Sequence, residues 1–141
     1  MQLTKKKGFT LIEIVIVLAI AALILVIVFL AVSGAQVARR NEQRRNDAAR
    51  ALAAYESTAA NSSGTYPTSG TAPTSFVANE PKSGTAYTFA AAVPAGAVMQ
   101  YITGNKCGTA GALAASTGAN NVAVRVELEP TATYYCVSNN Q

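Results

Sequence analysis

The residue types that usually carry out chemistry in proteins are scarce in this chain of 141 residues. Histidine, the commonest general base and a common metal ligand, is absent. Two cysteines, Cys107 and Cys136, are too few for a zinc site without histidine. No glycine-rich phosphate loop and no serine-centred elbow motif occurs. We therefore predict no catalytic residue, no metal site and no cofactor, and we expect a protein that is not an enzyme.

Cys107 and Cys136 allow two interpretations. They are either two unrelated buried thiols or a disulfide that joins a predicted loop (105–121) to a predicted strand (133–138). Disulfides persist outside the cytoplasm. Closing a loop of this size would stabilise a small domain by about 3–4 kcal/mol. We expect the disulfide, on the exported side of a membrane.

Glu13 is the carboxylate with the most unusual surroundings. Within residues 9–32 the only polar side chains are those of Thr10 and Glu13, and Ile14 to Val32 contains none. About 20 apolar residues span a bilayer as a helix. In lipid the backbone must satisfy its own hydrogen bonds, so a helix is expected in spite of the many Ile and Val residues. A carboxylate at the edge of such a segment is costly unless it has a partner.

The net charge of +4 is concentrated around this apolar segment. Three lysines precede it and five arginines follow it: Lys5, Lys6, Lys7, Arg39, Arg40, Arg44, Arg45 and Arg50. A nucleic-acid site needs clustered basic residues, which only the arginines offer. We expect these arginines instead to form a solvated helix face beside a membrane.

The helix is predicted to continue beyond the apolar segment, from Phe9 to about Ala60. No proline occurs from Ser33 to Ala60, and good helix formers dominate. A helix of this length would extend on the order of 75–80 Å at the usual rise per residue. An apolar stripe at helical spacing is expected to pack on the rest of the protein: Val37, Ala48, Leu52 and Tyr55. Opposite charges recur three residues apart on the same helix, in Glu42/Arg45 and Asp47/Arg50.

The remainder of the chain has the composition of loops and short strands. Residues 61–75 and 105–121 are predicted loops because they are rich in Gly, Ser, Thr, Asn and Ala. The predicted strands are 86–93, 97–104, 122–129 and 133–138. In the third of these, four apolar residues alternate with charged ones and are expected on one face: Val122, Val124, Val126 and Leu128. The order predicts an α+β fold, with a long N-terminal helix packed on a small antiparallel sheet of three or four strands.

Two rules disagree about which side of the membrane holds this sheet. The positive-inside rule would keep the arginine side in the cytoplasm. The cysteine pair and the Ser/Thr/Asn-rich composition indicate an exported side. We favour export, because the short lysine-containing N-terminus is typical of an export signal. One form of export is a secretory signal over residues 1–35, cleaved before Gln36, which would leave a secreted binding module.

The stretch "KKKGFTLIEIVIVL" resembles the N-terminus of type IV pilins and pseudopilins. Their signal is a short basic leader, a glycine, usually a phenylalanine, then a threonine, and a glutamate four residues after the phenylalanine. This chain matches with Lys5–Lys7, Gly8, Phe9, Thr10 and Glu13. The resemblance is strong over residues 5–32 and weaker over 33–60. Beyond residue 60 it extends only to the general layout.

The resemblance implies specific roles for three residues. A membrane-embedded prepilin peptidase would cut between Gly8 and Phe9 and methylate the new amine of Phe9. In a filament, Glu13 would then neutralise the Phe9 amine of an adjacent subunit and so set the axial stagger of the helices. Many relatives carry a glycine and a proline where this chain has Ala22 and Leu30. The helix is therefore expected to stay continuous where relatives kink or melt.

These observations predict the major subunit of a type IV pilus, a filament for adhesion, twitching motility or DNA uptake. The expected parts are a leader (1–8), a membrane and filament-core helix (9–32), an amphipathic continuation (33–60) and a globular region (61–141). The expected partners are other copies of the chain, prepilin peptidase, the inner-membrane pilus assembly machinery, the membrane before assembly, and a host or neighbouring cell surface or DNA. The expected location is the inner membrane for the precursor and the extracellular pilus afterwards.

The alternative within the family is a pseudopilin of a type II secretion or competence system. Secretion pseudopilins often bind calcium through acidic loops, and acids are few after residue 56.

Overall fold

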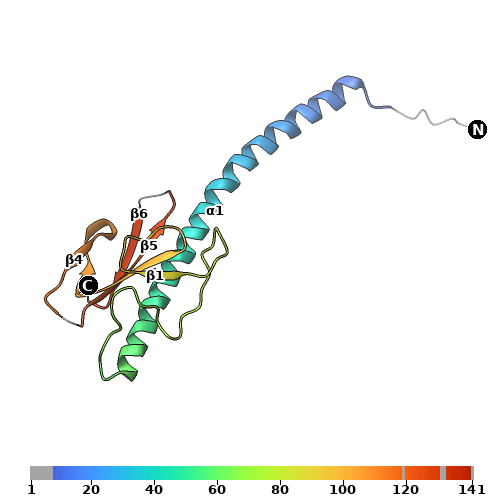
Figure 1. Ribbon diagram of the computed structural model, residues 1–141. Helices are drawn as coiled ribbons and strands as arrows, with labels where there is room; N and C mark the ends of the chain where they lie inside the picture. Colours follow the sequence, from blue (N-terminus) through green and yellow to red (C-terminus); the bar gives the residue numbers. More distant parts are fainter. Residues whose placement is uncertain (1–7, 119, 131–132, 141) are drawn as a thin grey trace, which may run out of the picture. The chain divides into compact units, whose positions relative to one another are not determined.

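The computed structural model describes residues 8–118, 120–130 and 133–140 (Figure 1). One helix, α1 (Leu11–Asn61), precedes all of the strands. The strands are β1 (Thr88–Ala90), β2 (Val98–Thr103), β3 (Asn105–Cys107), β4 (Leu113–Ala115), β5 (Val122–Leu128) and β6 (Thr133–Ser138), with a short 3-10 helix, η1 (Thr109–Gly111), between β3 and β4. The chain divides into two compact units, one ending at Val37 and the other beginning at Ala38. Helix α1 contributes to both, and each unit is described by itself.

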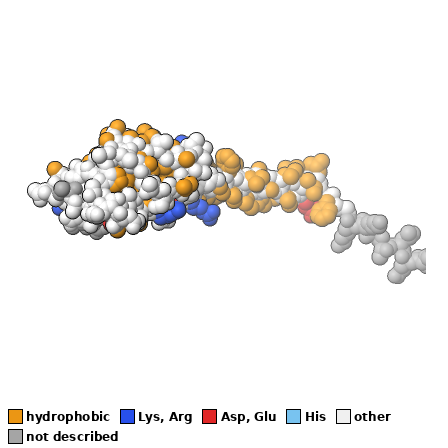
Figure 2. Space-filling model, turned by 60° about the horizontal axis from the view of Figure 1, so that its bottom comes forward, with side chains coloured by type: hydrophobic (Ala, Val, Ile, Leu, Met, Phe, Trp, Pro, Cys, Tyr) orange, Lys and Arg blue, Asp and Glu red, His pale blue; other side chains and the backbone are white. Residues whose placement is uncertain are grey.

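The first unit contains the apolar part of α1. The helix begins at Leu11, two residues later than predicted, and is continuous through Ala22 and Leu30 as expected. Its side chains are exposed, and Figure 2 shows hydrophobic side chains covering this part of the helix on the visible face. By length and composition, it is the one helix in the described part of the chain that could cross a membrane.

The second unit is built by packing the later part of α1 on one face of a sheet. Ala48, Leu52 and Tyr55 of the predicted stripe are buried, and so is the predicted apolar face of β5: Val122, Val124, Val126 and Leu128. The Tyr55 ring stacks on Tyr101 of β2, with ring centroids 3.6 Å apart. The Tyr55 hydroxyl donates a hydrogen bond to the Thr71 carbonyl at 2.6 Å. The helix stripe and the β5 face therefore form one core, which confirms the predicted α+β packing.

The main sheet has four strands in the order β1-β2-β5-β6. The pairs β2–β5 and β5–β6 are antiparallel, as predicted. The prediction of a wholly antiparallel sheet is wrong for β1, which pairs with β2 in parallel, Thr88 opposite Val98. The connection through Pro94 and Gly96 forms no tight hairpin. It is held instead by a hydrogen bond from Gln100 Nε2 to the Ala91 carbonyl at 2.7 Å.

Residues 105–121, predicted as a loop, contain a small hairpin. Strands β3 and β4 pair antiparallel, with Cys107 opposite Leu113. Three-residue strands are too short to show an alternating pattern in sequence, and a two-stranded ribbon of this size is marginal without further support. The support comes from contact with β5 and β6, which a local reading of the sequence could not anticipate.

Candidate functional site

Gly8 and Phe9 lie immediately before α1, outside any helix or strand, and both are exposed. The Phe9 side chain is 84% exposed. The bond predicted for cleavage therefore joins two exposed residues outside regular secondary structure. The predicted basic leader residues Lys5–Lys7 lie outside the described part of the chain.

Glu13 and Thr10 are hydrogen-bonded to each other at the N-terminus of α1. Its Oε2 accepts hydrogen bonds from the Thr10 backbone N–H at 2.8 Å and from the Thr10 hydroxyl at 2.7 Å. The Glu13 N–H lies 3.4 Å from Thr10 Oγ1 in return. This reciprocal arrangement is a capping box, in which an N-cap threonine and a glutamate three residues later satisfy helix-end donors. The sequence reasoning did not assign Thr10 this role, although a threonine three residues before a glutamate, ahead of an apolar run, is its known signal.

The same four residues, Gly8, Phe9, Thr10 and Glu13, line one hollow at the surface of the first unit. The bond predicted for cleavage and the predicted assembly carboxylate are therefore neighbours. Glu13 uses Oε2 for both Thr10 bonds, and its side chain is exposed. A cation that enters this hollow can approach the carboxylate directly.

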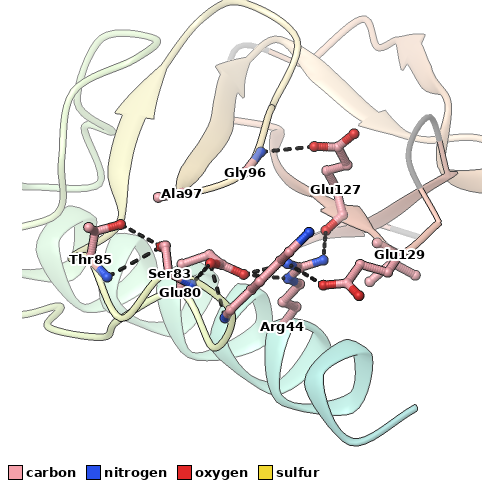
Figure 3. Close-up of a pocket in the computed structure, with 10 residues that line it drawn as sticks. Arg44, Glu80, Ser83, Thr85, Gly96, Ala97, Glu127 and Glu129 are labelled. Atoms are coloured by element: carbon pink, nitrogen blue, oxygen red, sulfur yellow. Dashed lines mark hydrogen bonds and ion pairs between the residues drawn. The ribbon is translucent and has the colours of Figure 1, made fainter. Parts of the chain in front are cut away.

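The second unit holds a buried ion-pair cluster, which Figure 3 shows around Arg44. Arg44 is 4% exposed and Glu80 is 2% exposed. Arg44 Nε donates to Glu80 Oε1 at 3.0 Å, and Arg44 Nη2 forms a second, short contact with the same oxygen. The other Glu80 oxygen accepts the backbone N–H groups of Lys82 and Ser83. Burial alone would raise the pKa of Glu80, but these hydrogen bonds outweigh it and lower the pKa to about 2.

Glu129, just beyond β5, connects this cluster to two further residues of α1. Its carboxylate lies 2.7 Å from Arg40 Nη2 and 3.1 Å from Arg44 Nη2. Its backbone exchanges two hydrogen bonds with the Asn41 side chain, at 2.7 and 2.8 Å. Hydrogen bonds from Arg40 lower the pKa of Glu129 against a smaller effect of burial. One residue in the turn after β5 thus binds three residues of the helix.

The expectation that all five arginines form a solvated face is therefore wrong for Arg44 and incomplete for Arg40, whose side chain is 26% exposed. Arg44 lies four residues before Ala48, so it falls on the buried stripe of α1. That spacing was visible in the sequence, but the acidic partners come from distant segments. The predicted helix pairs Glu42–Arg45 and Asp47–Arg50 are present, at 3.9 and 3.2 Å.

The ion-pair cluster borders a cavity of about 410 Å³. The carboxylates that line it already have partners: Glu80 and Glu129 bind arginines, and Glu127 Oε2 accepts the Gly96 N–H at 2.8 Å. Among the residues that the structure describes, no group of three or more His, Cys, Asp or Glu side chains could hold a metal ion.

Cys107 of β3 and Cys136 of β6 form a disulfide, with their Cα atoms 5.7 Å apart. The bond joins the β3–β4 hairpin to the last strand of the main sheet. The structure therefore agrees with the disulfide and not with two unrelated buried thiols.

Comparison with known protein families matches residues 3–29 to the prokaryotic N-terminal methylation motif. No curated protein and no solved structure matches the chain. The matched residues include Gly8, Phe9, Thr10 and Glu13 together with most of the exposed apolar helix. This motif implies processing by a prepilin peptidase, and with the apolar helix it fits a membrane-anchored precursor for pilus assembly. The chain therefore carries the N-terminal signature of the type IV prepilin-like proteins.

Proposed function

We propose that this chain is the major subunit of a type IV pilus, an extracellular filament used for adhesion, twitching motility or DNA uptake. One observation carries the proposal: the methylation motif, residues 3–29, runs into a helix whose apolar side chains are exposed from Leu11 to Val32. In water such a surface is strongly unfavourable. The membrane would cover it in the precursor, and the helices of other copies would cover it in a filament.

Maturation would begin at the exposed bond between Gly8 and Phe9. Hydrolysis there removes the basic leader and leaves Phe9 with a free amine, which the same peptidase would methylate. The cut leaves Thr10 and Glu13 on the mature chain, so the capping box is retained. The new amine would appear beside the hollow that Glu13 lines.

Assembly would then depend on charge neutralisation at Glu13. Moving an unpaired carboxylate into an apolar bundle costs several kcal/mol, on the order expected for a buried charge. The Phe9 amine of an adjacent copy would cancel this charge when the two helices adopt one axial stagger. Glu13 would therefore select the register of the filament, while the apolar side chains supply most of the contact area.

The charged residues of the second unit support a pilin over a calcium-binding pseudopilin. Glu80 and Glu129 are bound to arginines, and Glu127 accepts a backbone N–H. To bind calcium, these three carboxylates would have to give up hydrogen bonds to their present partners.

The decisive experiment is to shear fibres from the cell surface, identify their principal polypeptide, and determine its N-terminus by mass spectrometry. We expect this chain, starting at a methylated Phe9. A product that starts at Gln36 would support the secreted binding module instead. A methylated Phe9 on a chain that stays in the envelope and is missing from the fibres would support a pseudopilin.

A further inference from the structure

Strand β6 is an edge strand of the main sheet, and half of its backbone faces away from that sheet. It pairs with β5 along its whole length. Just past its end, the Asn139 N–H donates to the Val122 carbonyl at 3.3 Å. Hydrogen-bonded positions alternate along an antiparallel pair. Tyr135 and Val137 therefore bond to β5, and the backbone groups of Tyr134, Cys136 and Ser138 face outward.

Residues 105–115, which comprise β3, η1 and β4, cover this outward edge. We call this segment the edge cover. It contacts all three outward residues, two of them through their side chains: Cys107 is bonded to the Cys136 sulfur, and the Cys107 N–H donates to Ser138 Oγ at 3.2 Å. Gly111 lies so close to Tyr134 that a Cβ built on it would be 2.1 Å from the Tyr134 carbonyl oxygen. Only glycine fits there, and its φ of +73° also favours glycine.

The edge that is covered would otherwise be prone to pair with another strand. The sequence of β6, TYYCVS, is uncharged and rich in residues that favour strands. It contains neither proline nor a charged residue, which are the usual protections of an exposed edge. The edge cover itself is a two-stranded ribbon of three-residue strands, which is marginal without support. Its attachment must therefore depend heavily on the disulfide.

We propose that the edge cover is a redox-dependent guard. A dithiol reductant reduces the Cys107–Cys136 bond to two thiols and is itself oxidised to a disulfide; this frees the outer edge of β6, which then pairs antiparallel with β6 of a second copy. This inference goes beyond the proposed pilus function and does not depend on it. One register uses all three outward positions of both strands, because it places Cys136 opposite Cys136 and Tyr134 opposite Ser138. Shifting the register by two residues in one direction leaves Ser138 unpaired, and in the other direction leaves Tyr134 unpaired.

This register makes a chemical prediction. Directly opposed residues at a hydrogen-bonded position have Cα atoms about 5.5 Å apart, which lies within the range of a disulfide. Two Cys136 thiols held in this way can be oxidised by oxidised glutathione. One sulfur–sulfur bond then forms between the copies, the glutathione disulfide is reduced to two thiols, and the two protons of the cysteines are transferred to these thiols.

The test uses the full-length chain in detergent micelles with oxidised glutathione as the oxidant. Cys107→Ser leaves Cys136 on the edge, and we expect a covalent dimer on non-reducing gels. The matched control Cys136→Ser leaves Cys107 on the edge cover and should give about tenfold less dimer, since no strand pairing aligns that thiol. A second control, Cys107→Ser with Cys136→Ser and Ser138→Cys, places a thiol on the same edge away from the centre of the pairing and should also dimerise little. Equal dimer in all three variants would overturn the proposal, and so would its absence from Cys107→Ser.

Hydrogen exchange of dilute Cys107→Ser checks that the effect is local. The backbone amides of Cys107, Gly108 and Ala112 in the edge cover should exchange about tenfold faster or more than in the wild type, as expected for a locally released segment. The amides of Tyr135 and Val137 should keep their protection, because β5 still binds them. If these two amides lose protection as well, the disulfide holds the whole sheet together and the guard proposal is wrong.

Discussion

At the scale of single residues, the most deeply buried ion pair among the described residues is that of Arg44 with Glu80. Both side chains are almost fully buried, so each depends on the other for compensation of its charge. Removing one partner of such a pair usually costs about 3–5 kcal/mol, because the remaining charge is left buried. We expect Arg44→Met to lower the free energy of unfolding by about this amount. The matched control Arg39→Met, on the exposed side of α1, should change it by less than about 0.5 kcal/mol. Urea unfolding followed by circular dichroism measures both.

The same pair predicts how stability depends on pH. The pKa of Glu80 is lowered from an ordinary value of 4.5 to about 2 in the folded protein. A lowered folded-state pKa gives stability that is complete above the unfolded pKa and is lost as the pH falls through the folded one. We expect the wild type to lose stability between about pH 4.5 and pH 2. Arg44→Met should show a smaller loss across this window. Equal slopes for the two proteins would contradict this assignment.

The pKa of Asp47 is shifted upward, in the opposite direction from that of Glu80. Its side chain is 5% exposed, and within the described residues its Oδ2 has no hydrogen-bond partner. Burial raises the pKa of Asp47, and Arg50 offsets only part of this. When the pKa of a carboxyl is higher in the folded state than in the unfolded state, the free energy of unfolding falls as the pH rises and the folded-state carboxyl ionises. We expect Asp47→Asn to stabilise the protein at pH 7 by about 1 kcal/mol, with the gain shrinking in acid. Glu42→Gln, which is exposed on the same helix, should give no comparable gain in the same unfolding assay.

At the scale of elements, the sequence predicted what local patterns encode. Periodicity predicted α1 and the buried face of β5, and both are present because burial follows side-chain spacing. It did not predict the parallel pairing of β1 or the β3–β4 hairpin, since each depends on contacts between distant segments. The prediction that Arg44 is solvated was wrong for the same reason. Its spacing indicates a buried position, but a charged side chain is buried only with partners, and Glu80 and Glu129 come from distant segments.

The loop between α1 and β1 is anchored by a glycine that the sequence alone did not distinguish. Gly70 and Gly64 have the same φ of +81°, but only Gly70 lies against other atoms: a Cβ there would be 2.8 Å from the Ala91 nitrogen. Alanine at either position carries the left-handed backbone strain of about 1–2 kcal/mol. We expect Gly70→Ala to lower the free energy of unfolding by a further 1–3 kcal/mol or so, as overpacking does. Gly64→Ala is the matched control. Equal losses in thermal unfolding would show that the contact with Ala91 relaxes freely.

At the scale of the whole molecule, Glu13 has two candidate roles that can be separated. In the structure it caps α1 through Thr10, and in the proposed filament it also pairs with a neighbour's amine. We expect Glu13→Ala to leave a folded, membrane-inserted protein that forms few filaments, because no register cancels the amine charge. Thr10→Val removes the hydroxyl of the cap but keeps the carboxylate, so it should assemble much better. Electron microscopy of sheared fibres, with immunoblots for total protein, compares the two variants. Normal fibre yield from Glu13→Ala would refute the pairing.

The start of α1 at Leu11 has a consequence for maturation. The cap is made entirely by residues that follow the proposed cut, and the bond to be cut lies before the helix. Removal of the leader would then change the electrical character of the terminus, from three lysines to a single ammonium group, without any refolding. A subunit stored in the bilayer would already have the conformation that it needs for polymerisation, so the timing of fibre growth would be governed by proteolysis and supply rather than by a folding step.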